Sequence, residues 1–125
     1  MELELKELSG QVIGACIAVH RELGPGFLES VYENALQVEL RRRQIPAGFQ
    51  KEVCIQYAGE VVGVHQLDLL VAEQLVVELK AVRELAGIHF SQVRSYLRAT
   101  GLTHGLLVNF STMPLTIRRV ICDGI

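Results

Sequence analysis

The sequence predicts an α/β protein in which a mixed β-sheet is flanked by helices. Two segments at the start carry apolar residues at helical spacing, and the middle of the chain is rich in β-branched residues with strand patterning. A further helical pattern stands between two apolar strands. A helix that connects two buried strands of one sheet implies a right-handed parallel crossover. The predicted order of elements is therefore α-α-β-β-β-α-β-β.

Composition restricts the class of protein. The chain has 125 residues, half of them hydrophobic, which fits a single domain over residues 1–125 with one core. Three scattered cysteines without CxxC spacing indicate reduced thiols. No apolar stretch is long enough to span a membrane, and the first residues are too acidic for a secretory signal. We therefore expect a cytoplasmic protein without a membrane partner.

The charge balance excludes a strong overall attraction to nucleic acid, because the formal net charge is -2. Any contact with DNA or RNA would have to be local. The local candidates are Arg41-Arg42-Arg43, the pair Arg94 and Arg98, and Arg118-Arg119. Each cluster also fits a solvated surface.

Two helical patterns open the chain. Apolar residues recur at spacings of three and four from Leu5 to Leu23, and Gly24-Pro25-Gly26 ends this helix. A second pattern runs from Leu28 to Leu40, with Arg41 to Arg43 in its last turn, where cations suit the helix dipole. Glu29 therefore falls in the first turn of the second helix.

The middle of the chain predicts three strands in a meander. Residues 51–57 alternate between apolar and polar side chains, and the turn Ala58-Gly59-Glu60 follows. Residues 61–71 and 75–82 are apolar on both faces, which is typical of strands covered on both sides. The short polar link Ala72-Glu73-Gln74 joins these two strands.

The last third of the chain predicts one helix and two strands. Phe90, Val93 and Leu97 mark a helix face, and Gly101 is a natural terminator. A buried strand includes Leu106-Leu107-Val108, and a final strand covers residues 115–121.

Charged residues inside the two most apolar strands are the informative anomaly. Asp68 lies in the first of these strands, and Glu78 and Lys80 lie in the second, each with apolar neighbours on its own face. An unpaired buried carboxylate is costly, so these groups need partners or a metal. The odd-length link predicts that Asp68 stands opposite Glu78 and that Gln66 stands opposite Lys80.

The charges of this cluster suit a divalent cation. Asp68, Glu78 and Lys80 sum to minus one, and Glu29 would make minus two. Ligand sets made only of oxygen favour Mg²⁺ or Mn²⁺, which can polarise a phosphate oxygen and acidify a bound water. Lys80 could orient that water or stabilise charge on the phosphate. From spacing alone, a metal site and a buried ion-pair network bridged by Lys80 are supported equally.

These motifs resemble a known superfamily. Asp68, nine intervening residues and then Glu78-Leu79-Lys80 resemble the D-(x)n-ExK signature of the PD-(D/E)XK nucleases. The segment from Gly26 to Tyr32 resembles the GxxExxY pattern that names a family of small bacterial proteins in that superfamily. The resemblance covers nearly the whole chain and implies a restriction-endonuclease-like core. Leu67 stands where the superfamily's name has proline, a position that varies widely among members.

The resemblance implies roles for single residues. The positions of the metal ligands are those of Asp68, Glu78, Leu79 and Glu29, with Leu79 contributing its carbonyl. Lys80 matches the catalytic lysine. Gln92 and Tyr96 resemble the QxxxY motif of the exonuclease-type branch, in which both side chains border the active site. They lie four residues apart and so share a helical face.

Two functions follow as hypotheses. The first is a nuclease-like phosphodiesterase that acts on DNA or RNA through metal-activated water, with Mg²⁺ or Mn²⁺ as cofactor and DNA favoured over RNA. The second is a non-catalytic nuclease-fold module that binds a protein partner or a nucleic-acid end. A chain this small offers little surface for gripping a duplex, so we expect a homodimer or a larger complex.

Overall fold

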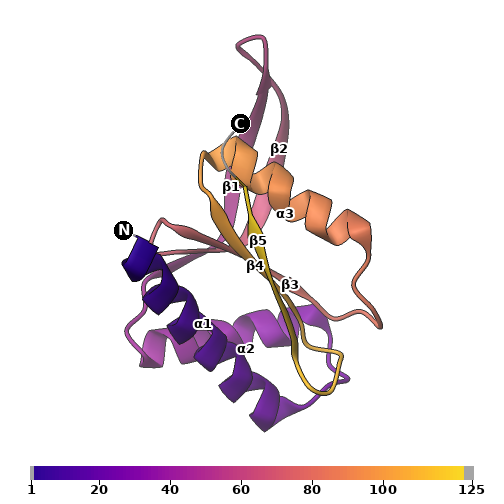
Figure 1. Cartoon of the computed structure of the whole chain (residues 1–125). Helices are drawn as coiled ribbons and strands as arrows, with labels where there is room; N and C mark the ends of the chain where they lie inside the picture. The colour runs from indigo at the N-terminus through magenta and orange to yellow at the C-terminus, as the bar shows by residue number, and fades with distance from the viewer. Residues whose placement is uncertain (1, 123–125) are drawn as a thin grey trace.

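The computed structural model describes residues 2–122, with side chains from Leu5 onward. The predicted order of elements is confirmed (Figure 1). The elements are α1 (Glu2–Leu23), α2 (Glu29–Arg42), β1 (Ala47–Tyr57), β2 (Glu60–Val71), β3 (Leu75–Lys80), α3 (Gly87–Thr100), β4 (His104–Asn109) and β5 (Thr116–Ile121). Within the described part of the chain, no helix is both long and apolar enough to cross a membrane.

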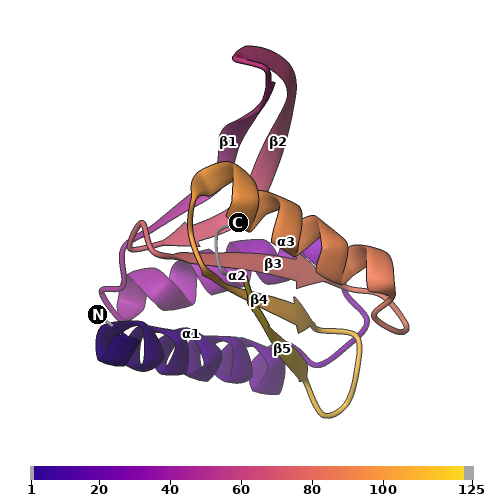
Figure 2. The ribbon, with the colours of Figure 1, turned by 45° about the horizontal axis from the view of Figure 1, so that its top comes forward.

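The five strands form one mixed sheet in the order β1-β2-β3-β4-β5. β3 and β4 run parallel, as the crossover through α3 predicted, and the other neighbours are antiparallel. Figure 2 shows α3 above the sheet and α1 and α2 below it. The predicted fold class, a mixed sheet flanked by helices, is therefore confirmed.

Two apolar clusters lie on the two faces of the sheet. The cluster beside α1 and α2 includes Val12, Leu36, Val77, Leu106 and Phe110, all fully buried. The cluster beside α3 includes Val76, Val93, Leu97 and Leu107, also fully buried. Because β3 and β4 alternate between the two clusters, they are apolar on both faces.

Gly105 allows α3 to pack close to β4. A Cβ atom at this position would stand 2.8 Å from Val93 Cγ1 and 3.3 Å from the Val76 carbonyl oxygen. Real Cβ atoms essentially never come as close as the first of these distances. Any larger residue would push α3 away from the sheet.

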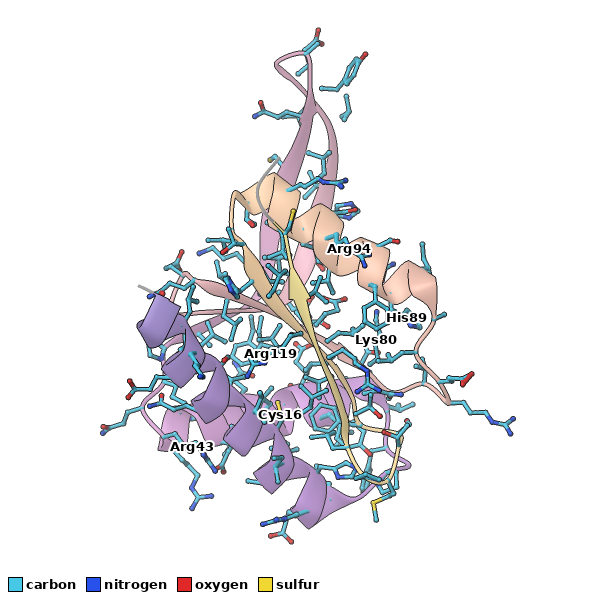
Figure 3. All side chains as sticks on the ribbon, in the orientation of Figure 1. Cys16, Arg43, Lys80, His89, Arg94 and Arg119 are labelled. Atoms are coloured by element: carbon cyan, nitrogen blue, oxygen red, sulfur yellow. The ribbon has the colours of Figure 1, made fainter. Side chains whose placement is uncertain are left out.

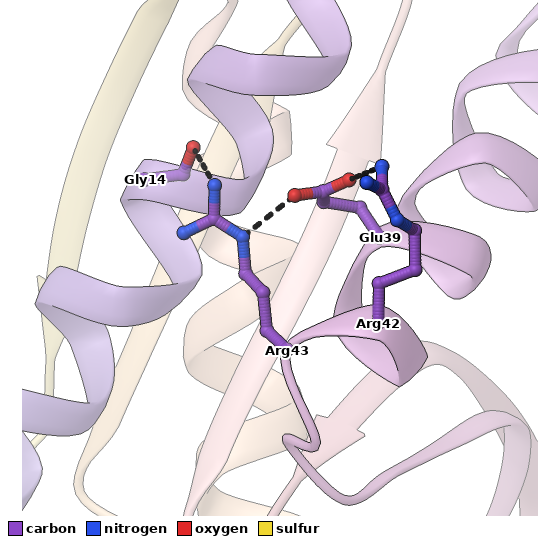
Figure 4. Close-up of polar contacts among 4 residues, drawn as sticks. All are labelled: Gly14, Glu39, Arg42 and Arg43. Atoms are coloured by element: carbon purple, nitrogen blue, oxygen red, sulfur yellow. Dashed lines mark hydrogen bonds and ion pairs between the residues drawn. The ribbon is translucent and has the colours of Figure 1, made fainter.

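Two arginines at the end of α2 pair with Glu39, and the Arg42 side chain remains 74% exposed. Glu39 accepts hydrogen bonds from Arg42 at 3.2 Å and from Arg43 at 2.7 Å (Figure 4). Arg43 also reaches the Gly14 carbonyl oxygen on α1 at 3.5 Å. These contacts tie the end of α2 to the middle of α1.

The β1–β2 hairpin extends beyond the rest of the sheet (Figure 1). β1 begins four residues earlier than predicted, because Ala47 to Phe49 pair with the inner end of β2. The prediction that residues 61–71 are covered on both faces is wrong for their outer half. Val61 and Val62 are 57% and 64% exposed, since only β1 pairs with β2 beyond Leu69.

The hairpin also changes which side of the sheet its side chains face. Leu69 packs in the cluster beside α1 and α2, whereas Leu67, two residues earlier, packs in the cluster beside α3. In a regular strand both would lie on one face. The switch coincides with Gln50, which has a φ of 53° and interrupts the ladder opposite Asp68.

Candidate active site

The predicted acidic pair lies where β2 and β3 separate. The ladder between these strands ends at Leu69 and Val77, and the next residues outward are Asp68 and Glu78. This register places the two carboxylates opposite each other, as the odd-length link predicted. The predicted pairing of Gln66 with Lys80 is wrong, because the ladder ends at Leu69 and Val77. The Leu79 N–H donates to Asp68 Oδ2 at 2.9 Å, so Asp68 bridges to the neighbouring strand with its side chain.

Glu78 is a buried carboxylate with one satisfied oxygen. Its Oε2 accepts from Lys80 Nζ at 3.4 Å, and its Oε1 has no hydrogen-bond partner among residues 2–122. Burial raises the pKa of Glu78 to about 8, with a further increase from the charge of Asp68 and a decrease from Lys80. In the absence of a metal, burial and the charge of Asp68 therefore favour the protonated form of this carboxyl.

Asp68 is half-buried and responds to the same neighbours. Burial raises the pKa of its carboxyl, while the Leu79 N–H and the Lys80 ammonium lower it. Contacts with the side chains of Gln50 and Glu78 lower it further. The two carboxylates thus form one titrating pair rather than two independent groups.

Glu29 lies in the first turn of α2, as predicted. Partial burial raises the pKa of its carboxyl, the charge of Asp68 raises it further, and Lys80 and the backbone of Ala81 lower it. The start of α2 therefore stands within electrostatic reach of the acidic pair. Lys80 lies at the end of β3, on the side of the molecule where α3 begins and His89 is found (Figure 3).

The acids do not form a closed three-ligand cage. Residues 2–122 contain no group of three or more His, Cys, Asp or Glu side chains placed to hold one metal ion. This arrangement differs from a structural zinc site, which takes four protein ligands. Mg²⁺ instead uses one or two carboxylates and keeps several waters. The Asp68–Glu78 pair, with the orphaned Oε1 of Glu78, fits that second pattern.

Tyr32 fixes the turn that delivers Glu29. Its hydroxyl donates to the Gly24 carbonyl oxygen at 2.6 Å and accepts from the Phe27 N–H at 3.2 Å. Its ring stacks on Phe110 with centroids 4.6 Å apart. The structure assigns it to the core, from which it clamps the turn.

The same core contact reaches the lysine strand. The Phe110 N–H donates to the Lys80 carbonyl oxygen at 2.9 Å, so the residue stacked on Tyr32 also anchors the end of β3. The buried side chain of Asn109 accepts from the Val82 N–H at 3.1 Å and donates to the Val82 carbonyl oxygen at 2.8 Å. Asn109 thus fixes the segment after β3 through its side chain.

Sequence reasoning missed Gln50. Its side chain donates to Glu33 Oε1 on α2 at 2.8 Å and also contacts Asp68, whose pKa it lowers. Its φ is positive, and at this point in β1 the side chains of the hairpin change from one face of the sheet to the other. No signal in the sequence distinguishes it, because a glutamine beside a strand rarely takes a positive φ.

Gln92 and Tyr96 lie one turn apart on α3. Burial raises the pKa of the Tyr96 hydroxyl, and the charges of Glu78 and Asp68 raise it further, so Tyr96 lies within electrostatic reach of the acidic pair. Gln92 Oε1 is buried without a hydrogen-bond partner in the described part of the chain. His65 contacts the Tyr96 ring edge-on, with centroids 5.2 Å apart.

Comparisons with known proteins identify a family and a similar fold. The family model described as "PD-(D/E)XK nuclease superfamily" matches residues 6–120. The solved structure "Crystal structure of SSO0001" is similar with a TM-score of 0.60 and 20% identity, over 74% of this chain and 48% of that one. The present chain thus spans about half the length of that protein, and the likeness shows the fold. No curated protein sequence matches.

Proposed function

This chain belongs to the PD-(D/E)XK nuclease superfamily, and on that premise we propose that it is a metal-dependent phosphodiesterase acting on nucleic acid. Membership suggests a nuclease-like function, and nucleases of this superfamily generally use divalent metals such as Mg²⁺. We further infer membership of the GxxExxY family. Gly26, Glu29 and Tyr32 support that inference by their places in one short segment. Gly26 has a positive φ in the turn, Glu29 opens α2, and the Tyr32 hydroxyl holds the turn through Gly24 and Phe27.

The observation that carries the proposal is the Oε1 atom of Glu78, which is buried and has no hydrogen-bond partner among the described residues. A buried carboxylate oxygen without a partner is costly, and the adjacent Asp68 adds a like charge. In the metal-free protein a proton reduces that cost. A divalent cation would remove it by satisfying both carboxylates, which is why the residues present fit Mg²⁺ or Mn²⁺.

The proposed roles follow from position. Asp68, Glu78 and the carbonyl of Leu79 would hold the ion, and Glu29 would support it from α2. When bound, the ion supplies Lewis-acid polarisation of a phosphate oxygen and acidifies water for attack. The Lys80 ammonium is close enough to Glu78 to orient that water or to stabilise charge on the phosphate.

Gln92 and Tyr96 would position the substrate. Tyr96 lies within electrostatic reach of the carboxylate pair, and the buried Gln92 Oε1, one turn away, has no hydrogen-bond partner among the described residues. We favour DNA over RNA as the substrate. We place the reaction in the cytoplasm. A homodimer or a larger complex would supply the additional surface that gripping a duplex requires.

Calorimetry with Mn²⁺ and Mg²⁺ tests the metal site. We expect the intact protein to bind, and Asp68→Asn and Glu78→Gln to weaken binding by at least about tenfold, since each removes a charged ligand. Glu73→Gln is the matched control, because Glu73 is an exposed carboxylate paired with Lys51 at 3.2 Å. Cleavage of DNA and RNA is then measured in the same buffers.

A non-catalytic module is the second candidate, favoured by the Lys80–Glu78 contact at 3.4 Å. In that case the acids survive as an ion-pair cluster that binds a partner protein or a nucleic-acid end. Such a cluster should neither bind Mn²⁺ nor lose thermal stability when a chelator is added. Absence of Mn²⁺ binding to the intact protein would therefore select this candidate.

A further inference from the structure

A second feature lies beside the acidic pair, between the β1–β2 hairpin and α3. It is a cleft of about 620 Å³. Its lining comes from the hairpin residues Cys54, Ile55, Gln56 and His65 and from the α3 residues Ser95, Arg98 and Ala99. This volume is in the range of small-molecule sites, about 300–1,000 Å³. Figures 1 and 2 both show the hairpin rising beside the end of α3.

The lining differs in charge from the neighbouring acidic pair. Arg98 is its one permanent cation, and none of the seven lining residues is a carboxylate. The Gln56 amide offers donors, while the Ser95 hydroxyl donates to the Ser91 carbonyl oxygen at 2.9 Å and keeps only its acceptor capacity. Guanidinium groups bind phosphate through paired hydrogen bonds. The cleft therefore suits an anion with an apolar or aromatic part.

The cleft and the acidic pair share strand β2, which carries both His65 and Asp68. His65 lines the cleft, and its exposed ring stands 5.2 Å from that of Tyr96 at an interplanar angle of 64°. The charges of Glu78 and Asp68 both raise the pKa of the Tyr96 hydroxyl. The cleft thus extends from Arg98 to His65, which lies three residues before Asp68 on β2. Aromatic side chains in such a groove are stacking platforms for unpaired bases.

We propose that this cleft holds a single-stranded segment of the nucleic acid next to the phosphate that is cleaved. In it, Arg98 contacts a backbone phosphate and His65 stacks on a base. This inference rests on the proposed function and names its substrate class, a strand end or gap with unpaired bases. A duplex would lie across the mouth of the cleft, with its bases stacked away from His65.

Binding of labelled oligonucleotides tests the cleft without hydrolysis. Fluorescence anisotropy in the presence of a chelator compares single-stranded DNA, single-stranded RNA and a blunt duplex. We expect both single strands to bind at least about tenfold more tightly than the duplex, because stacking on His65 needs an unpaired base. The DNA and RNA arms show which sugar the cleft accepts.

Two arginines of α3 give a matched pair of variants. Arg98→Ala should weaken single-strand binding by about tenfold, as expected for the loss of a charged hydrogen bond. Arg94→Ala should change it by less than about twofold, since Arg94 is exposed one turn earlier and does not line the cleft. Circular dichroism of both variants checks that each remains folded.

Cys54 provides an independent footprint. It is exposed and lines the cleft, whereas Cys16 is buried and its pKa is raised to about 12. A single-stranded oligonucleotide should slow alkylation of Cys54, measured by mass spectrometry of its peptide, and should leave the rate at Cys122 unchanged. Cys122 is half-buried outside the cleft and serves as the internal reference.

The outcomes separate the two proposals. Protection of Cys54 together with the larger effect of Arg98→Ala supports the cleft. Binding or cleavage without protection of Cys54, or equal losses in the two arginine variants, would overturn the cleft and leave the phosphodiesterase standing. Failure of every oligonucleotide to bind, together with no cleavage in Mg²⁺ or Mn²⁺, would overturn both.

Discussion

At Glu78, one carboxylate oxygen contacts an ammonium and the other has no partner among residues 2–122. The neutral acid is favoured there because burial and the charge of Asp68 oppose ionisation more than Lys80 assists it. A cation that binds the pair must displace the proton. The protonation of Glu78 therefore links metal binding to pH.

Metal affinity should rise with pH and level off above about 8, the pKa of Glu78. Below that pH, each binding event should release about one proton, because the carboxylate must be ionised to act as a ligand. Calorimetry in two buffers of different ionisation enthalpy measures the released protons. An affinity that stays constant between about pH 6 and about pH 9 would contradict this linkage.

The stability of the metal-free protein should have the opposite slope. The pKa of Glu78 is about 8 in the folded protein and 4.5 for the ordinary group, so the folded state binds the extra proton between these values. Its contribution is complete below about pH 4.5 and is lost as the pH rises through about 8. Urea unfolding should show a steeper loss over that window in the intact protein than in Glu78→Gln.

Tyr32→Phe should destabilise the protein by about 1–3 kcal/mol. The change leaves the ring on Phe110 but removes both contacts of the hydroxyl, with Gly24 and Phe27. Metal affinity should fall with it, because the turn before Glu29 loses its clamp. Tyr57→Phe is the control, since Tyr57 is 76% exposed at the hairpin tip. Similar urea midpoints for the two variants would exclude a clamping role for Tyr32.

At the scale of elements, the turn between α1 and α2 sets where the second helix begins. Gly26 has a φ of 115°, a conformation that side chains with a Cβ rarely adopt, and an added Cβ would have nothing within 4 Å. The cost of a substitution there is thus conformational rather than steric. The change in stability on substitution of Gly26 therefore reports on backbone conformation and not on packing.

Gly26→Ala should lower the free energy of unfolding by about 1–3 kcal/mol. Gly10→Ala, in the interior of α1 with equally open surroundings, should raise it by about 0.5–1 kcal/mol. Denaturant unfolding of both variants measures the two signs. Equal effects at the two sites would show that Gly26 is not held in its left-handed conformation.

Helices and strands in which the apolar residues keep one constant spacing were predictable from the sequence. The helices and β3 to β5 appear within a few residues of their expected bounds, because packing on both faces of the sheet imposes a constant pattern. The outer hairpin differs because alternation assumes that a strand keeps its faces. Gln50 breaks that assumption because its φ is positive, which could not be predicted from the residue type.

The part of the site that depends on the pairing register of β2 and β3 was predictable from the sequence. The three-residue link after Val71 fixes Asp68 opposite Glu78, so local length sufficed for the acidic pair. The partners of the Tyr32 hydroxyl and the cleft at Arg98 depend on contacts between segments far apart in the chain. Periodicity indicates that a side chain is buried but not which atom its polar end meets.

Over the whole molecule, stability should fall from the centre of the sheet to the hairpin tip. β3 and β4 are covered on both faces, while residues 55–62 pair only within the hairpin. Native-state hydrogen exchange should therefore be slowest in β3 and β4 and fastest in the outer hairpin among the sheet amides. Uniform protection along β2 would contradict this gradient.

The hairpin also determines how the protein behaves at high concentration. β1 stands at one edge of the sheet, and Val61, Val62 and Val64 are exposed on the strand beside it. Exposed edges with β-branched side chains are templates for intermolecular pairing. The net charge of -2 gives little general repulsion, so resistance to aggregation depends on a few charges along the hairpin, among them Lys51, Glu52 and Glu60. These residues act as gatekeepers, and colloidal stability is controlled there rather than at the acidic pair.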